Sequence, residues 1–191
     1  GSLLPWSLQL AQAGYRTISL DLRNHGRSGA APSGYGLREA HDVADAVAAL
    51  RARGEVVGPL HLMGVSYGAA TAIFSARELG LQVDNVIAIE SFDNAGGAIR
   101  DMVPHMLAKP PESVSQRISH RLLRMQMDDG ALERAIASAS DTLQLRLDRV
   151  DVGAALAQVP SCVLLLHGRE DRHVPVAHGR ALAAAAPRAH Y

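Results

Sequence analysis

Short apolar runs alternate with longer segments of helical periodicity along most of the chain. The predicted strands are residues 15–22, 59–64, 83–91 and 162–168. The predicted helices are residues 36–54, 67–79 and 175–187. Such an alternation is typical of a mostly parallel sheet whose faces are covered by helices, so the sequence predicts an α/β fold.

The alternation is interrupted between residues 92 and 159, which contain no convincing strand. Three stretches there have helical character, at residues 97–109, 112–127 and 130–150. We therefore expect a helical cap to be inserted into the α/β core. The predicted organisation is a first part of the core at residues 1–91, the cap at 92–159 and a second part of the core at 160–191.

A serine stands between two glycines in the sequence Gly64-Val65-Ser66-Tyr67-Gly68. This spacing matches the G-x-S-x-G nucleophile elbow, in which a sharp turn from a strand to a helix exposes a serine hydroxyl. Five residues alone are a weak signal, but here a predicted strand ends just before the motif and a predicted helix follows it. Ser66 is therefore the candidate nucleophile.

Two further stretches support this interpretation. "GYRTISLDLRNHGRSG" (14–29) resembles the strand and D-x-R-x-H-G-x-S loop of the α/β-hydrolase family, particularly its monoacylglycerol-lipase-like and prolyl-aminopeptidase-like branches. "HGREDRHVP" (167–175) resembles the segment that carries the catalytic acid in that family. The resemblance implies that Asp171 is the acid, with the adjacent Glu170 as a rival, and that the backbone N–H of Tyr67 is one oxyanion donor.

A serine hydroxyl is a poor nucleophile until an imidazole accepts its proton and a carboxylate orients that imidazole. None of the nine histidines fits the position that the resemblance assigns to this base. His173 follows Asp171 too closely, and His190 is predicted to be a residue of a last strand. The resemblance therefore implies a core that is truncated at both ends, lacks the catalytic histidine and is inactive as an isolated segment.

Composition narrows the range of partners. Nineteen basic residues balance 19 acidic ones and are scattered along the chain, so neither nucleic acid nor an anionic membrane is expected as a partner. No apolar stretch reaches the length of about 20 residues that a transmembrane helix needs, and we expect a cytoplasmic protein. The single cysteine, Cys162, provides neither a disulfide nor a metal site and is predicted to be buried.

The function implied by the resemblance is hydrolysis of a carboxylic ester, or less readily a small amide, through an acyl-enzyme and without cofactor or metal. One alternative is a prolyl-aminopeptidase-like peptidase whose acidic pocket holds a free amine. The acidic residues of the cap that leave this open are Glu112, Asp128, Asp129 and Glu133. Another alternative is a homologue that only binds a small-molecule ligand in the same pocket.

Overall fold

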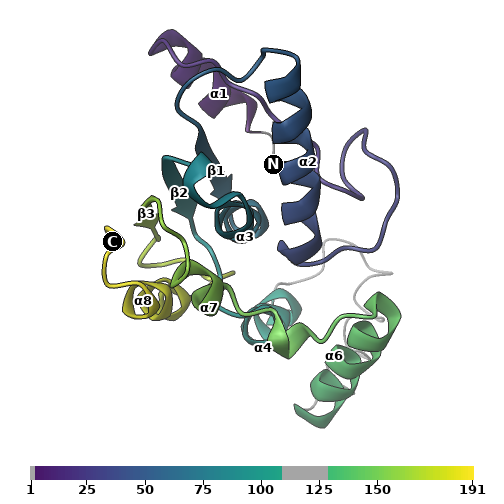
Figure 1. The fold of residues 1–191 in the computed structure, drawn as a ribbon. Coiled ribbons are helices and arrows are strands. Elements are labelled where there is room, and N and C mark those ends of the chain that lie inside the picture. Colours follow the sequence, from purple (N-terminus) through teal and green to yellow (C-terminus); the bar gives the residue numbers. More distant parts are fainter. Residues whose placement is uncertain (1–2, 109–128) are drawn as a thin grey trace. The chain divides into compact units, whose positions relative to one another are not determined.

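The computed structural model describes residues 3–108 and 129–191 (Figure 1). The chain divides into two units, Gly1–Pro32 and Ser33–Tyr191, and each is described by itself. The first unit contains helix α1 (Leu4–Gln12), which has a proline in its first turn and no buried residue. A proline is well tolerated there because the first N–H groups of a helix have no partner within the helix.

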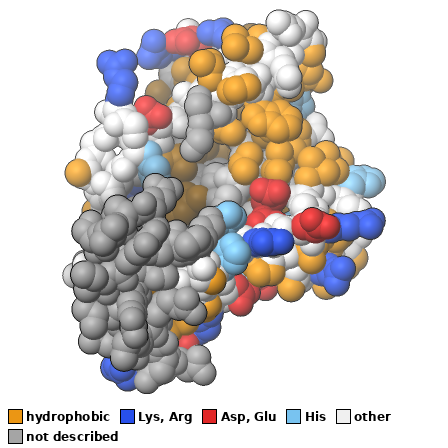
Figure 2. All heavy atoms as spheres, turned by 180° about the vertical axis from the view of Figure 1, so that it is seen from behind, with side chains coloured by type: hydrophobic (Ala, Val, Ile, Leu, Met, Phe, Trp, Pro, Cys, Tyr) orange, Lys and Arg blue, Asp and Glu red, His pale blue; other side chains and the backbone are white. Residues whose placement is uncertain are grey.

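The predicted strand at residues 15–22 is wrong. In the described part of the chain, no neighbouring strand supplies hydrogen bonds to this segment, and it forms no regular element. Ile18 and Leu20 are 43 % and 46 % exposed. A strand exists only where a partner satisfies its backbone groups, and a local apolar pattern cannot supply that partner. Figure 2 shows that apolar side chains remain visible on one face of the molecule beside charged ones.

The loop after this segment closes on Asp21. The Asp21 carboxylate accepts a hydrogen bond from Arg27 N (3.0 Å), and the Asp21 carbonyl accepts one from Ser28 Oγ (2.6 Å). Gly26 adopts a φ of +53°, and a Cβ at this position would lie 2.3 Å from the Asp21 carboxylate. The neighbouring His25 binds the carbonyl of Arg23 through Nδ1 at 2.9 Å. These contacts agree with a role of His25 in shaping the loop.

The second unit is built on three parallel strands, β1 (His61–Val65), β2 (Asn85–Ile89) and β3 (Cys162–Leu166), in the order β1-β2-β3. All three lie within a residue of the predicted positions or inside them. His190, which was predicted to be a strand residue, forms an isolated parallel bridge with Leu164 of β3. The pairing aligns the carboxyl ends of all three strands, because Val65 is opposite Ile89 and Ile89 is opposite Leu166.

Strand β3 shows why the prediction for Cys162 is wrong. Val163 and Leu165 are buried, whereas Cys162, Leu164 and Leu166 point to the opposite face and are exposed. Successive side chains of a strand point to opposite faces, so a continuous apolar run does not by itself bury every residue.

Helices α2 (Leu37–Ala52), α3 (Tyr67–Leu79), α7 (Val152–Leu156) and α8 (Val176–Ala185) contact one another in that order. Helix α3 packs on β1 and β2, and α8 packs on β3 (Figure 1). The core is centred on α3, where Ile73 and Phe74 are buried between alanines that allow close packing. Helix α2 ends at Ala52, and Gly54 follows the C-cap residue Arg53 as the predicted stop, with a φ of +68° that favours glycine.

The segment between β2 and β3 is mainly helical where it is described. It contains α4 (Ala95–Ala108), α6 (Asp129–Leu143) and the 3₁₀ turn η2 (Leu147–Arg149), and a further 3₁₀ turn, η1 (Gly80–Gln82), precedes β2. The helix predicted at residues 112–127 lies outside the described residues. Arg100 of α4 binds Glu133 of α6 (2.6 Å) and Asp148 of η2 (2.8 Å). The cap limits at residues 92 and 159 remain a prediction.

None of the helices in the described residues is long and apolar enough to cross a membrane.

Candidate active site

Ser66 follows β1 directly and precedes the first residue of α3. Its backbone has φ 52° and ψ −113°, a conformation that residues other than glycine rarely adopt. Holding it stores about 1–3 kcal/mol of strain. Ser66 N donates to Ile89 O at 2.8 Å, and the Ser66 carbonyl accepts from the N–H groups of Ala69 and Ala70. The residue is only half-buried. The predicted strand-turn-helix context of the motif is therefore present, with the serine at a strained turn.

Gly64 is required by close backbone packing at this turn. A Cβ at Gly64 would lie 2.0 Å from the carbonyl oxygen of Gly68, a distance that no rotamer change can relieve. Gly68, in contrast, has no heavy atom within 4 Å of the position of a Cβ in the described residues. The two glycines of the motif thus differ in their physical role: the first makes room for the backbone of the second.

We expect Gly64→Ala to destabilise the protein by more than about 3 kcal/mol, because the added methyl group must displace backbone rather than a flexible side chain. Gly68→Ala is the matched control and should change the free energy of unfolding by less than about 1 kcal/mol. Chemical denaturation of both variants measures the difference. Equal stabilities of the two variants would show that the close approach of residues 64 and 68 is not maintained in solution.

Tyr67 begins α3, and the first N–H groups of an α-helix point out of its end without a partner in the helix. The N–H of Tyr67, which is the predicted oxyanion donor, is one of these groups. The hydroxyl of Tyr67 donates to Glu39 Oε1 at 2.9 Å and accepts from Tyr35 N at 2.9 Å. Burial, together with the negative charge of Glu39, raises the pKa of Tyr67 to about 12. The tyrosine therefore stays neutral and hydrogen-bonded at physiological pH.

Asp171 lies in the loop after β3. Its Oδ1 accepts hydrogen bonds from His173 N (2.8 Å) and Val174 N (3.1 Å), and its side chain is 9 % exposed. The neighbouring Glu170 is exposed. Since the three strands are parallel and aligned, Ser66 and the Asp171 loop both lie at the carboxyl end of the sheet, on either side of β2. Active sites of open α/β sheets form at this end.

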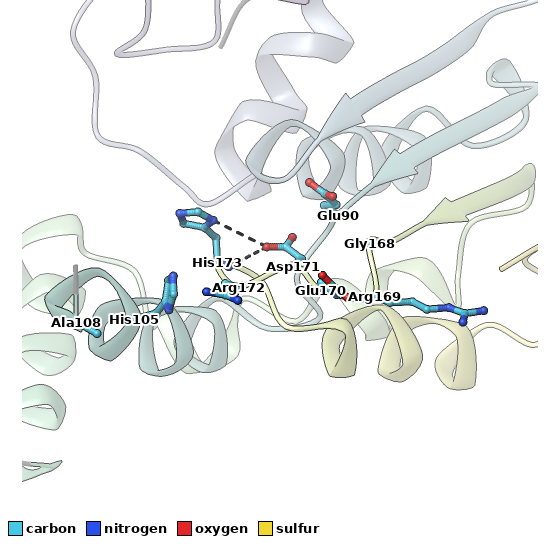
Figure 3. A pocket seen from close by; sticks show the side chains of 9 residues that line it. All are labelled: Glu90, His105, Ala108, Gly168, Arg169, Glu170, Asp171, Arg172 and His173. Carbon is cyan, nitrogen blue, oxygen red and sulfur yellow. Dashed lines mark hydrogen bonds and ion pairs between the residues drawn. The ribbon is translucent and has the colours of Figure 1, made fainter. Parts of the chain in front are cut away.

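Glu90 lies between them, directly after β2, and was not among the predicted site residues. It adopts a φ of 53°, and its N–H donates to Leu166 O at 2.7 Å. Its side chain lines an open cleft of about 1000 Å³ together with Asp171 (Figure 3). The remaining residues that line the cleft are His105, Ala108, Gly168, Arg169, Glu170, Arg172 and His173. Ser66 is not part of this lining, so the cleft adjoins the acid loop rather than the nucleophile.

Two histidines face this cleft. His173 is 56 % exposed, with its Nδ1 4.0 Å from Asp171 Oδ1, and its ring meets that of His105 edge-on at 5.4 Å between centroids. In Figure 3, His105 on α4 and His173 lie on the same side of Asp171. His167 is buried below the loop and donates from Nε2 to Val174 O at 2.8 Å, so it holds the loop rather than facing the cleft.

A fourth histidine, His178, is also buried and lies outside the cleft lining. His178 of α8 lies between Asp93 (2.5 Å to Nδ1) and Asp101 of α4 (3.1 Å to Nε2), and it connects the core to the first helix after β2. The sequence indicated only that His178 is helical. In the part of the chain that the structure describes, no three His, Cys, Asp or Glu side chains are grouped so that they could hold a metal ion.

Comparison with known proteins identifies the family of the chain. The family model of the alpha/beta hydrolases matches residues 2–191. The chain therefore belongs to the alpha/beta hydrolase family, and the predicted fold class is confirmed. A comparison with curated proteins found no match at the level of sequence.

Solved structures of low sequence identity share the fold. An esterase from Pyrococcus furiosus is 18 % identical with a TM-score of 0.67, and the alignment covers 98 % of this chain and 64 % of the esterase. An enol-lactonase from Burkholderia xenovorans is 20 % identical (TM-score 0.64, 99 % and 76 % covered). A putative non-heme bromoperoxidase from Mycobacterium tuberculosis is 21 % identical (TM-score 0.65, 100 % and 78 % covered). This chain thus spans less than two thirds of the Pyrococcus esterase.

Proposed function

We propose that this chain carries the nucleophile and the acid of a serine hydrolase that cleaves a carboxylic ester, or a small amide, through an acyl-enzyme. The observation that carries the proposal is the strained turn that places Ser66, a half-buried residue, between a parallel strand and the N-terminus of a helix. Asp171 is the proposed acid, and the backbone N–H of Tyr67 is the proposed oxyanion donor.

The chemistry follows from these positions. Ser66 Oγ attacks the carbonyl carbon of the substrate while its proton passes to an imidazole that Asp171 orients. The oxyanion is stabilised by N–H donors at the start of α3, including that of Tyr67. The tetrahedral intermediate then collapses, the bond to the leaving alcohol breaks, and the alcohol takes the proton from the imidazole. Water attacks the acyl-enzyme by the same route, which releases the acid and restores Ser66.

We further propose that none of His167, His173, His178 and His190 is the general base. His167 and His178 are engaged by Val174 and by Asp93 and Asp101, respectively. His190 pairs with β3 through its backbone. His173 is the described histidine nearest to the acid, but its Nδ1 is 4.0 Å from the Asp171 carboxylate and it follows that residue by only two positions.

The peptidase alternative is less well supported than ester hydrolysis. It needs a carboxylate that is available to bind a substrate amine, and Glu133 is already bound by Arg100 at 2.6 Å. The pairing lowers the pKa of Glu133 through its hydrogen bond to Arg100, so its charge is compensated within the protein. Glu112 and Asp128 lie outside the described residues, as does the side chain of Asp129.

A side-by-side assay of the full-length protein on a short p-nitrophenyl ester and on proline p-nitroanilide tests the proposal. We expect the ester to be hydrolysed with the higher kcat/KM, and the segment 1–191 alone to be inactive, because none of the four histidines discussed above is placed to activate Ser66. The control is His173→Ala in the full-length protein, which should retain activity.

Preferential cleavage of the anilide would support the peptidase instead, and no turnover of any ester or anilide would support a ligand-binding protein. Equal activity of the segment and the full-length protein, lost in His173→Ala, would identify His173 as the base.

A further inference from the structure

Glu39 is a carboxylate that the proposed chemistry does not use, yet it is fully buried at 0 % exposure. It is the third residue of α2. Its Oε1 accepts from Gly34 N and from the Tyr67 hydroxyl, and its Oε2 accepts from Gly36 N, each at 2.9 Å. A buried charge is tolerated only when it is well hydrogen-bonded, and here three donors surround one carboxylate.

The hydrogen bond between Glu39 and the Tyr67 hydroxyl is not required to cap α2. Gly36 N and Glu39 Oε2 complete the N-terminal cap of the helix by themselves. The other oxygen reaches across to Tyr67, the residue that immediately follows Ser66. Tyr35 N also donates to the Tyr67 hydroxyl, and the two tyrosine rings pack 5.7 Å apart. The side chain of Tyr67 is therefore held by two hydrogen bonds and one ring contact, from Glu39 and from Tyr35 in the loop before α2.

These contacts of Tyr67 matter for the preceding turn because the backbone of Ser66 is strained. A residue held in such a backbone conformation keeps it only if its surroundings constrain it on both sides. Before the turn, the hydrogen bond from Ser66 N to Ile89 O provides that constraint. After the turn, the chain passes through Tyr67, whose side chain is anchored to a buried carboxylate.

We propose that Glu39 is a positioning residue: through its hydrogen bond to the Tyr67 hydroxyl it holds the Ser66 turn and directs the Tyr67 N–H toward the developing oxyanion. Its catalytic consequence rests on the proposed serine hydrolase function. The geometric consequence, a fixed orientation of the first amides of α3, does not depend on that function.

The kinetic test uses the full-length protein and the variants Tyr67→Phe, Glu39→Gln and their combination. Tyr67→Phe removes one hydroxyl and leaves the cap of α2 intact. We expect kcat for a p-nitrophenyl ester to fall about 10- to 100-fold in each single variant with KM unchanged, since small displacements of catalytic groups have effects of this size. The double variant should be no slower than the slower single variant, because both changes break the same contact.

Ser75→Ala is the matched control. Ser75 is buried in the same helix and donates to Thr71 O at 2.7 Å, so this variant also removes a buried hydroxyl and its hydrogen bond. It should lower the melting temperature without changing kcat. If Tyr67→Phe behaves like Ser75→Ala, with reduced stability and unchanged kcat, Glu39 has only a structural role and the proposal is overturned.

A second readout separates this proposal from the hydrolase assignment. NMR amide shifts and hydrogen exchange of residues 66–68 should change in Tyr67→Phe and in Glu39→Gln but not in Ser75→Ala. If the wild type hydrolyses no ester, the proposed function fails, and the amide measurement still decides whether Glu39 positions the turn. Unchanged amides in Tyr67→Phe would overturn the proposal even if Glu39→Gln failed to fold.

Discussion

Ser66→Ala in the full-length protein is expected to reduce kcat for ester hydrolysis by about 10⁶, the loss seen when the serine of a comparable triad is removed. The reason is that the acyl-enzyme needs the Ser66 oxygen itself, and no neighbouring group can replace it. The measurement is the turnover of a short p-nitrophenyl ester by purified wild-type and variant protein at equal concentration.

The fold should survive this change, because the hydrogen bonds that hold the turn are made by the Ser66 backbone, not by its side chain. Circular dichroism and the melting temperature provide the control for folding. Activity above a few per cent of wild type in a folded Ser66→Ala variant would mean that another residue is acylated, or that hydrolysis proceeds without an acyl-enzyme.

Asp171→Asn is expected to lower kcat by about 10⁴, with a smaller effect on KM. An amide at this position can still accept the hydrogen bonds from His173 N and Val174 N, so the loop should keep its conformation. What is lost is the negative charge that orients the imidazole and stabilises its protonated form. Steady-state kinetics on the same ester measure the effect.

Two matched variants identify the acid. Glu170→Gln changes the exposed neighbour of Asp171, and Glu90→Gln changes the carboxylate that follows β2 on the same side of the sheet. Both should retain kcat within about 10-fold, because neither is the proposed partner of the base. A loss of about 10⁴ in kcat for Glu90→Gln, with Asp171→Asn still active, would identify Glu90 after β2 as the acid instead of Asp171 after β3.

The local sequence pattern was sufficient to predict the three strands and the helices α2, α3 and α8 of the second unit. Helix α3 has the predicted limits, 67 and 79, because its start is set by the turn at Ser66 and its end by Gly80. The strands were recognisable as short apolar runs between helical segments, although Leu164 and Leu166 of β3 are exposed. Residues 15–22 have a similar pattern but no partner strand among the described residues, and strand pairing is a property of the whole chain rather than of a segment.

The same distinction applies to the site. The G-x-S-x-G spacing predicted the Ser66 turn because a glycine is needed where Gly64 meets the Gly68 carbonyl. The contact between Glu39 and Tyr67 joins residues 28 positions apart, and that between His178 and Asp93 joins residues 85 positions apart. Neither has a local signature beyond a glutamate near a helix start and a histidine in a helix. Buried polar partners of this kind emerge only from the packed structure.

The central claim is that Ser66 is the residue that becomes acylated, and a fluorophosphonate probe tests it most directly. The probe forms a covalent bond with an activated serine hydroxyl, and peptide mapping by mass spectrometry then identifies the modified residue. We predict a single label on Ser66 in the folded full-length protein, and no label on protein that was denatured before the probe was added or on Ser66→Ala. A label on a different residue, or no label on the folded wild type, would contradict the account.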